Sequence, residues 1–220
     1  MIKLHTSVGR YELRIENGTK QPVIVANNKE YTLTMYEMLL WSKLTWHINT
    51  KDELKIKFNS FLQETGAADE NINFERIFNR LKTRDLIVSG QGYTGIDALY
   101  NLFSRLVVVP VSSRFHVKVI AFFNLLLKGN SFSVAIKVFS SVKLTPDEKF
   151  ILNLAHKGRI SAVDVIRVIN RLEGEAGENK TEEDAALFHE QRLSVLKSIA
   201  ELYEKRMILF DRKEANDETT

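Results

Sequence analysis

Three glycines have the spacing of a phosphate-binding loop. Gly90, Gly92 and Gly95 form the pattern G-x-G-x-x-G within LIVSGQGYTGI, residues 86–96, and in dinucleotide-binding folds such glycines let backbone amides approach a pyrophosphate. That loop follows the first strand of a β-α-β unit and precedes an acidic residue by about 20 positions. Here three predicted helices come first, and the chain beyond the glycines reads SRFHVK, residues 113–118. We therefore interpret the glycines as a tight turn between two short strands, at positions with positive φ.

Residue types that carry catalysis or bind metals are otherwise scattered. The chain has no cysteine, which excludes disulfides, thiolate nucleophiles and cysteine zinc sites. Its five histidines form neither an H-E-x-x-H motif nor a pair at helical spacing, and there is no G-x-S-x-G or P-loop motif. We expect no catalytic residues, no metal and no cofactor, and hence a binding protein that is not an enzyme.

Charge and hydropathy favour a cytoplasmic protein with no membrane contact. Lys and Arg outnumber Asp and Glu by 31 to 28, which gives a net charge of +3 and permits nucleic-acid binding. No apolar run reaches the roughly 18 residues that span a bilayer, and the N-terminus lacks the apolar core of a signal peptide.

The first half of the chain predicts a small sheet followed by three helices. Alternating apolar residues at 11–33, with turn residues at Asn17-Gly18 and Asn27-Asn28, predict antiparallel strands. Thr34, Thr50 and Asn73 are suited to cap the helices that follow. These helices are predicted over residues 35–46, 51–65 and 73–84. The stretch at 86–96 then predicts two strands around the glycine turn.

The second half repeats the pattern of the first. LTPDEKFIL at 144–152 corresponds to LTMYEMLL at 33–40, since both open a helix with Leu-Thr-x-x-Glu. IAELYEKRMILF at 199–210 corresponds to IFNRLKTRDLIV at 77–88, each with an Arg seven residues after an Ile. Between them, Ser161 is suited to cap a helix, and a long helix is predicted at 182–206 before the strand MILFD. The second copy is longer and carries an insertion near GEAGENKTEED.

The order strand, three helices, strand, turn, strand resembles a winged helix-turn-helix domain, and the repeat resembles two such domains in tandem, as in bacterial winged-helix transcriptional regulators. The resemblance implies a mainly α fold with small β-sheets, of the α+β class. It divides the chain into an N-terminal winged-helix domain at 1–105, an apolar helical connector or dimerisation segment at 106–143, a C-terminal winged-helix-like domain at 144–212 and a flexible tail at 213–220.

The resemblance also implies that the third helix, residues 73–84, enters the major groove of double-stranded DNA. Four basic residues face one acid there, and the polar types on its outer side are those that contact phosphates and base edges. The expected DNA-binding residues are Arg76, Asn79, Arg80, Lys82, Thr83 and Arg84 on the helix, with Gln91 and Tyr93 at the tip of the wing.

These features predict a dimeric DNA-binding transcriptional regulator. The corresponding helix of the second domain sets Lys197, Lys205 and Arg206 against Glu201 and Glu204, so that domain is expected to dimerise or to hold another protein. One alternative is a tandem winged-helix interaction subunit that binds a kleisin-like partner in an SMC-type chromosome or plasmid-defence complex. Another is a replication or plasmid-partition initiator.

Overall fold

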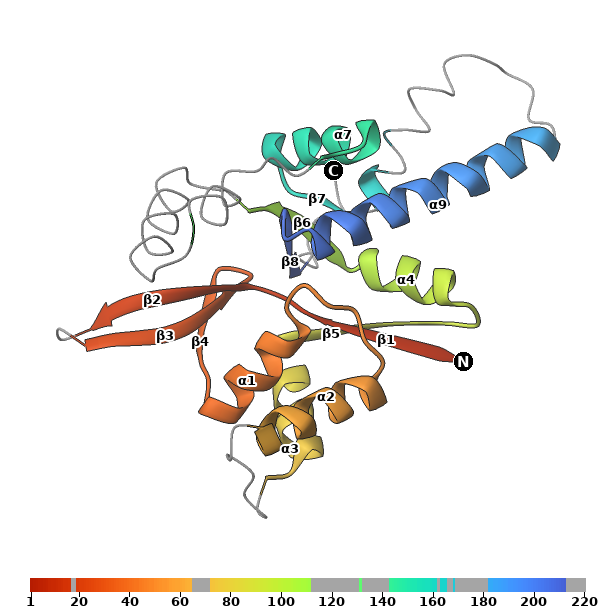
Figure 1. The fold of residues 1–220 in the computed structure, drawn as a ribbon. Coiled ribbons are helices and arrows are strands. Elements are labelled where there is room, and N and C mark those ends of the chain that lie inside the picture. Colours follow the sequence, from red (N-terminus) through yellow and green to blue (C-terminus); the bar gives the residue numbers. More distant parts are fainter. Residues whose placement is uncertain are drawn as a thin grey trace.

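The structure is a computed structural model, and it describes residues 1–16, 19–64, 72–111, 131, 143–161, 163–165, 168 and 182–212. It has an α+β fold in which helices pack on small antiparallel sheets (Figure 1). The strands are β1 (Ile2–Ser7), β2 (Arg10–Glu16), β3 (Thr19–Ala26), β4 (Lys29–Thr32), β5 (Ile87–Gly92), β6 (Leu106–Pro110), β7 (Ile160–Ser161) and β8 (Ile208–Arg212). The helices with defined bounds are α1 (Met35–Leu44), α2 (Lys51–Glu64), α3 (Phe74–Thr83), α4 (Gly95–Phe103), α7 (Pro146–Lys157) and α9 (Glu182–Glu204).

The first three helices begin where the sequence predicts. Thr34 caps α1 in a capping box with Glu37, and Thr50 exchanges the same hydrogen bonds with Glu53 before α2. Asn73 caps α3 through its side-chain oxygen. The apolar faces of these helices meet in one core, whose fully buried side chains include Leu40, Leu44, Leu54, Phe58 and Leu81.

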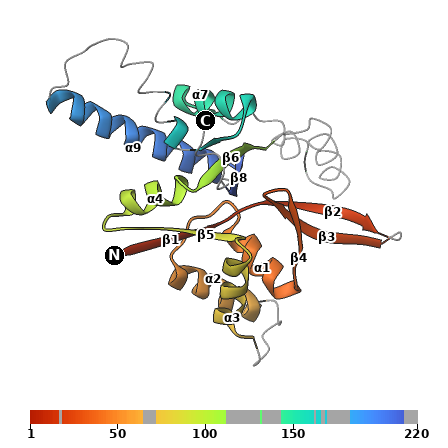
Figure 2. The same cartoon turned by 180° about the vertical axis from the view of Figure 1, so that it is seen from behind.

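The sheet predicted at 11–33 is confirmed as β2, β3 and β4, hydrogen-bonded in that order. Asn27 and Asn28 connect β3 to β4 with positive φ angles of 47° and 57°, the conformation that a two-residue hairpin turn requires. The predicted turn at residues 17 and 18 lies outside the described residues. Seen from both sides in Figures 1 and 2, β2 and β3 form a ribbon that projects away from the helices.

The predicted hairpin around the three glycines is wrong. β5 ends at Gly92, and the chain then enters α4, which Thr94 caps. The antiparallel partner of β5 is β1 at the start of the chain, with Ile2 opposite Gly92. In Figure 1, α1, α2 and α3 lie on one side of β1 and β5, and α4 lies on the other.

The glycines serve helix packing, and their predicted positive φ angles are wrong as well, since none of the three has one. A Cβ atom on Gly90 would lie 2.2 Å from the Leu102 nitrogen and 2.3 Å from the Ala98 oxygen, and one on Gly92 would lie 2.5 Å from the Ala98 nitrogen. Gly95, by contrast, has open space where its Cβ would be. Gly90 and Gly92 therefore let α4 lie directly on β5, a role that glycines also have between helix and strand in other folds.

The second half contains a three-stranded antiparallel sheet in the order β7-β6-β8. Thr145 caps α7 with Pro146 at its first position, and the long helix and final strand predicted from sequence are α9 and β8. Residues 106–110, predicted as the start of a helical connector, are instead the central strand β6, as suits a run of buried β-branched residues. The rest of that segment, at 112–130 and 132–142, and the tail at 213–220 lie outside the described residues.

Parts of the two halves are arranged alike. β1 pairs with β5 and forms an isolated bridge through His5 to Asn49, in the connection between α1 and α2, and β6 lies between β8 and β7. In both halves a strand comes first, a capped helix and further helical segments follow, and a strand paired with the first comes last; in the first half, β2, β3 and β4 stand between β1 and α1. Equivalent caps keep a constant separation of 111 residues, in the pairs Thr34 and Thr145, Glu37 and Glu148, and Thr50 and Ser161.

α3 and α9 end in the same way. The equivalent residues of the two ends differ by one position from the alignment that the Ile-to-Arg spacing predicts. The last backbone hydrogen bonds of the two ends run from Leu86 to Leu81 and from Met207 to Leu202. The preceding residues, Asp85 and Arg206, have φ angles of 58° and 59°. Arg84 therefore corresponds to Lys205, and the expected match of Arg84 with Arg206 is corrected.

The two halves pack together. One core contains Val8 just after β1, Val88 of β5, Leu102 of α4, and Ile151 and Ile199 of the second half. Across the same contact, the buried Tyr203 hydroxyl lies 2.9 Å from the Thr6 Oγ1 atom and donates to the Leu44 carbonyl at 3.2 Å.

Candidate nucleic-acid interface

The outer face of α3 is hollowed. Phe74, Phe78 and Leu81 recur at helical spacing and are buried, which turns the polar residues between them outward. A surface cavity of about 420 Å³ is lined by Arg76, Asn79, Arg80, Thr83 and Arg84. Five of the eight residues predicted to bind DNA thus meet in one hollow.

A buried carboxylate holds two arginines of this hollow. Glu37 is 1% exposed, and its Oε1 atom lies 3.1 Å from the Arg80 Nε atom while Oε2 lies 3.6 Å from Arg84 Nη1. The Oε2 atom also accepts the Thr34 N–H at 2.9 Å. One carboxylate therefore caps α1 and forms ion pairs with two guanidinium groups at the end of α3, although its Oε1 atom accepts no hydrogen bond. The sequence assigns Glu37 only to the helix cap. Glu148 occupies the equivalent position in the second half, and this recurrence was the one sequence signal that the glutamate has a further role.

Arg76 and Asn79 are exposed and remain available at the other end of the hollow. Among the described residues, neither side chain has an ion pair or hydrogen bond within the chain. The Thr83 hydroxyl, in contrast, donates to the Asn79 carbonyl at 2.9 Å. Arg76 and Asn79 are therefore the side chains of the hollow that can turn to a phosphate or a base edge without breaking an existing contact.

Lys82 lies outside the hollow and contributes to a second positive area around His5. The His5 ring is buried and packs edge-on against Phe78, with ring centroids 5.1 Å apart. Burial and then the charges of Lys3, Lys82 and Lys51 lower the pKa of His5 to about 4. At neutral pH this histidine is uncharged, so the positive field here comes from the lysines.

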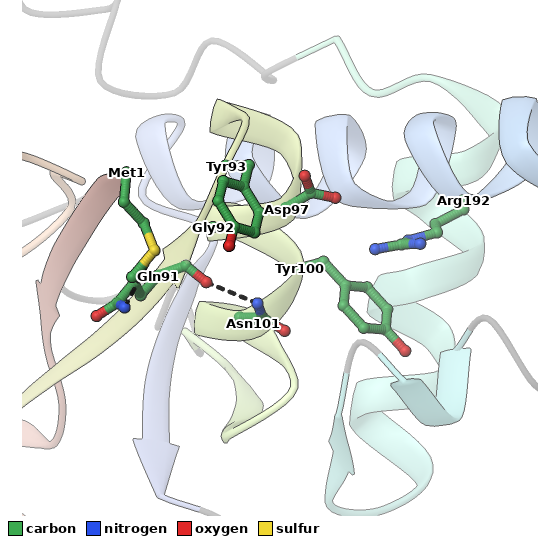
Figure 3. Close-up of a pocket in the computed structure, with 8 residues that line it drawn as sticks. All are labelled: Met1, Gln91, Gly92, Tyr93, Asp97, Tyr100, Asn101 and Arg192. Carbon is green, nitrogen blue, oxygen red and sulfur yellow. Dashed lines mark hydrogen bonds between the residues drawn. The ribbon is translucent and has the colours of Figure 1, made fainter.

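β5 leads away from the end of α3, and its six residues are about 17 Å long. Gln91 and Tyr93 lie at the end of β5 that is distant from α3. They line a separate pocket of about 360 Å³, drawn in Figure 3, with Met1, Gly92, Asp97, Tyr100, Asn101 and Arg192. The structure therefore does not bring the two predicted wing residues together with the hollow.

Contacts of α4 with β5 and with α9 shape this second pocket. Asn101 Nδ2 donates to the Gln91 carbonyl at 2.7 Å, and the Arg192 guanidinium lies 3.7 Å from the centre of the Tyr100 ring. Sequence reasoning missed Tyr100, Asn101 and Arg192, because their proximity depends on how the two halves pack and no local pattern reports it.

The end of α9 carries the same type of ion pair as α3. Lys205 Nζ lies 2.5 Å from the buried Oε1 atom of Glu148 and 3.7 Å from Glu201. Burial acts to raise the pKa of Glu148, but hydrogen bonds from Lys205 and Thr145 outweigh it, and the pKa is lowered. Lys197 also pairs with Glu201, at 3.9 Å. Lys205 and Lys197 are thus paired with glutamates within the second half, as Arg80 and Arg84 are with Glu37 in the first.

Comparison of the chain with protein-family models, curated proteins and solved structures gives no match. Within the described ranges, no helix is both long and apolar enough to cross a bilayer. The same part of the chain contains no cluster of three or more His, Asp or Glu side chains arranged to hold a metal ion.

Proposed function

We propose that the protein is a dimeric, DNA-binding transcriptional regulator in which α3 contacts the major groove. The observation that carries the proposal is the hollow on α3, where Arg76, Asn79, Arg80, Thr83 and Arg84 line one surface of a short amphipathic helix. Such a surface combines phosphate binding by arginine with the amide and hydroxyl groups that read bases.

The topology supports two winged-helix units in tandem. The second half has a three-stranded antiparallel sheet. In the first half β1 and β5 form a two-stranded antiparallel sheet that one isolated bridge, from His5 to Asn49, extends, and three helices accompany it. In a winged helix, the strand that completes the wing hairpin follows the helices. Here the corresponding strands, β1 and β6, precede the helices of their halves. The order of strands along the chain is thus permuted relative to the order that the resemblance implies.

With this permutation the wing is open, and its tip would be formed by the end of β5 and the start of β1 in place of a hairpin turn. The end of β5 and the start of β1 lie together, with Gln91 Nε2 donating to the Met1 Sδ atom at 3.4 Å. Tyr93, which is 87% exposed, extends from this tip. In the proposed complex, Gln91 and Tyr93 contact the DNA backbone beside the groove that α3 enters.

The arginines of the hollow differ in whether they are paired with Glu37, and we propose different roles for them in DNA binding. Arg80 and Arg84 are held in place, so their outward N–H groups form a fixed anion site. Arg76, which has no such anchor among the described residues, adapts to the phosphate or base. Lys82 adds charge on the adjacent side of the helix.

Selection of bound fragments from a pool of random duplex DNA tests this function. An enriched palindromic site is the expected result, because a two-fold symmetric dimer reads two inverted half-sites. Failure to enrich any sequence, with binding no stronger than that of a basic control protein, would contradict it.

A second candidate function is to hold another protein, such as a kleisin-like chain of an SMC-type complex. It is favoured by the second half, in which Lys205 and Lys197 are already paired with glutamates. Copurification of a stoichiometric kleisin-like chain, together with no sequence enriched from random DNA, would favour this candidate over the first.

A further inference from the structure

β2 is an edge strand with an exposed apolar face. The order β2-β3-β4 leaves its outer edge without a strand partner in the part of the chain that the structure describes. Tyr11, Leu13 and Ile15 lie on one face and are 51%, 54% and 73% exposed. Exposed edges of this kind pair readily with another strand.

The other face of β2 alternates in charge. Arg10, Glu12 and Arg14 occupy successive positions of that face, and Arg10 and Arg14 lie 2.6 Å and 3.1 Å from the carboxylate oxygens of Glu12. The sequence of the strand, RYELRIE, alternates charged and apolar residues, and its charges run positive, negative, positive and negative.

This pattern is complementary to itself when the strand is reversed. We propose that β2 pairs with β2 of a second copy of the chain, antiparallel and symmetric about Leu13. Position 12 then lies opposite position 14, and position 10 opposite position 16, so that every positive position faces a negative one. On the apolar face, Tyr11 lies opposite Ile15 and Leu13 opposite its own equivalent. Opposite charges and apolar pairs directly across a ladder are stabilising.

Neighbouring registers lack this match. A shift that centres the pair on Glu12 or on Arg14 sets like charges opposite one another at the centre, which is destabilising. A shift by an odd number of residues sets apolar side chains against charged ones. Registers centred on Tyr11 or Ile15 also match opposite charges, but each pairs only three residues of the strand, whereas the register centred on Leu13 pairs all seven. The sequence of β2 therefore favours the register centred on Leu13.

The shape of the chain allows the pairing. The ribbon of β2 and β3 projects away from the helices, as Figure 2 shows from behind. A two-fold axis perpendicular to the sheet keeps both apolar strips on one face, where they merge into a continuous strip. The product is a continuous sheet through both copies, in the order β4-β3-β2-β2-β3-β4.

The inference specifies the dimer that the proposed DNA-binding function assumes. It rests on β2 alone, and its tests contain no DNA. Failure of the dimer and failure of DNA binding are therefore distinguishable.

Because the chain has no cysteine, single cysteines can report the register. Across an antiparallel pair the Cα atoms at position 13 are about 4.5–5.5 Å apart, within reach of a disulfide. Those at position 15 are separated by four residues along the strands, about 14 Å. Mild oxidation of Leu13→Cys should give a covalent dimer, and Ile15→Cys should give none, although its non-covalent pairing persists. Equal cross-linking of both variants, or none of either, would overturn the proposal.

Charge exchange gives an independent test by sedimentation equilibrium. Glu12→Arg and Arg14→Glu each set like charges across both symmetric pairs, and each should weaken self-association at least about tenfold. An equimolar mixture of these two variants restores opposite charges at every pair, so it should sediment near twice the chain mass of 25.3 kDa. If the two variants dimerise as tightly as the original chain, or if their mixture fails to associate, β2 is not the interface.

Discussion

The carboxylate of Glu37, buried at the start of α1, lies 3.1 Å from the Nε atom of Arg80 near the end of α3. The second half contains a similar ion pair, between the buried Glu148 and Lys205. In each copy, the glutamate of a helix-capping box is thus the anion that holds a cation at the end of a later helix. Arg80 and Arg84, which we propose to contact DNA, are therefore also part of the folded structure of the first half.

Removal of both cations should expose the cost of this buried carboxylate. Arg80→Ala alone leaves Arg84 beside Glu37, and we expect a loss of about 1–2 kcal/mol in the free energy of unfolding. The double variant Arg80→Ala with Arg84→Ala leaves the charge unpaired, and we expect about 3–5 kcal/mol. Urea unfolding at pH 7 measures both. Arg76→Ala is the matched control and should change stability by less than about 0.5 kcal/mol; an equal loss in the control would refute this role of Glu37.

Gly90 and Gly95 should differ sharply in their tolerance of a methyl group. A Cβ on Gly90 would meet the α4 backbone at 2.2 Å, so Gly90→Ala must displace α4 and should cost at least about 3 kcal/mol. Gly95→Ala has open space at the first position of a helix and should be neutral or slightly stabilising. Thermal melts of the two variants decide the matter, and similar melting temperatures would mean that α4 does not pack on β5 as described.

The glycines also show what sequence can and cannot predict here. Helices with a cap such as Thr34 or Asn73 were predicted within a few residues, because capping is a local signal. The strand that pairs with β5 could not be predicted in this way. Its partner β1 is separated from it by three helices along the chain, and local turn residues do not identify such a distant strand. For the same reason, the polar outer side of α3 follows from the pattern of one amphipathic helix, whereas the burial of Glu37 and the pocket beside Arg192 depend on tertiary packing.

The hydroxyl of Tyr203 should contribute to the contact between the two halves. It is buried, and burial raises its pKa. Tyr203→Phe keeps the ring but leaves the Leu44 carbonyl without this donor, and we expect a loss of about 1–2 kcal/mol in unfolding free energy. Unfolding monitored by tryptophan fluorescence and by circular dichroism should stay coincident in the original chain; well-separated transitions would show that the halves fold independently.

His5 should make stability depend on pH. Its folded-state pKa of about 4 lies below the unfolded value of about 6.5, so between these values the unfolded chain binds the extra proton. The contribution of the neutral ring is complete above pH 6.5 and is lost as the pH falls toward 4. Between pH 7.5 and pH 5, the original chain should lose about 2 kcal/mol more stability than His5→Leu. Parallel pH profiles of the two proteins would contradict a buried, neutral His5.

The most direct test of the DNA-binding account is the salt dependence of affinity for duplex DNA, measured by fluorescence anisotropy. Arg76→Ala with Lys82→Ala removes two charges of α3 and spares the Glu37 ion pairs. Arg105→Ala with Lys149→Ala removes the same net charge from exposed positions elsewhere and is the control. The account predicts that the α3 variant binds at least about tenfold more weakly and that its slope of log affinity against log salt falls by about 2, with the control unchanged. Equal affinities and slopes for the two variants would contradict the assignment of α3 as the DNA-binding surface.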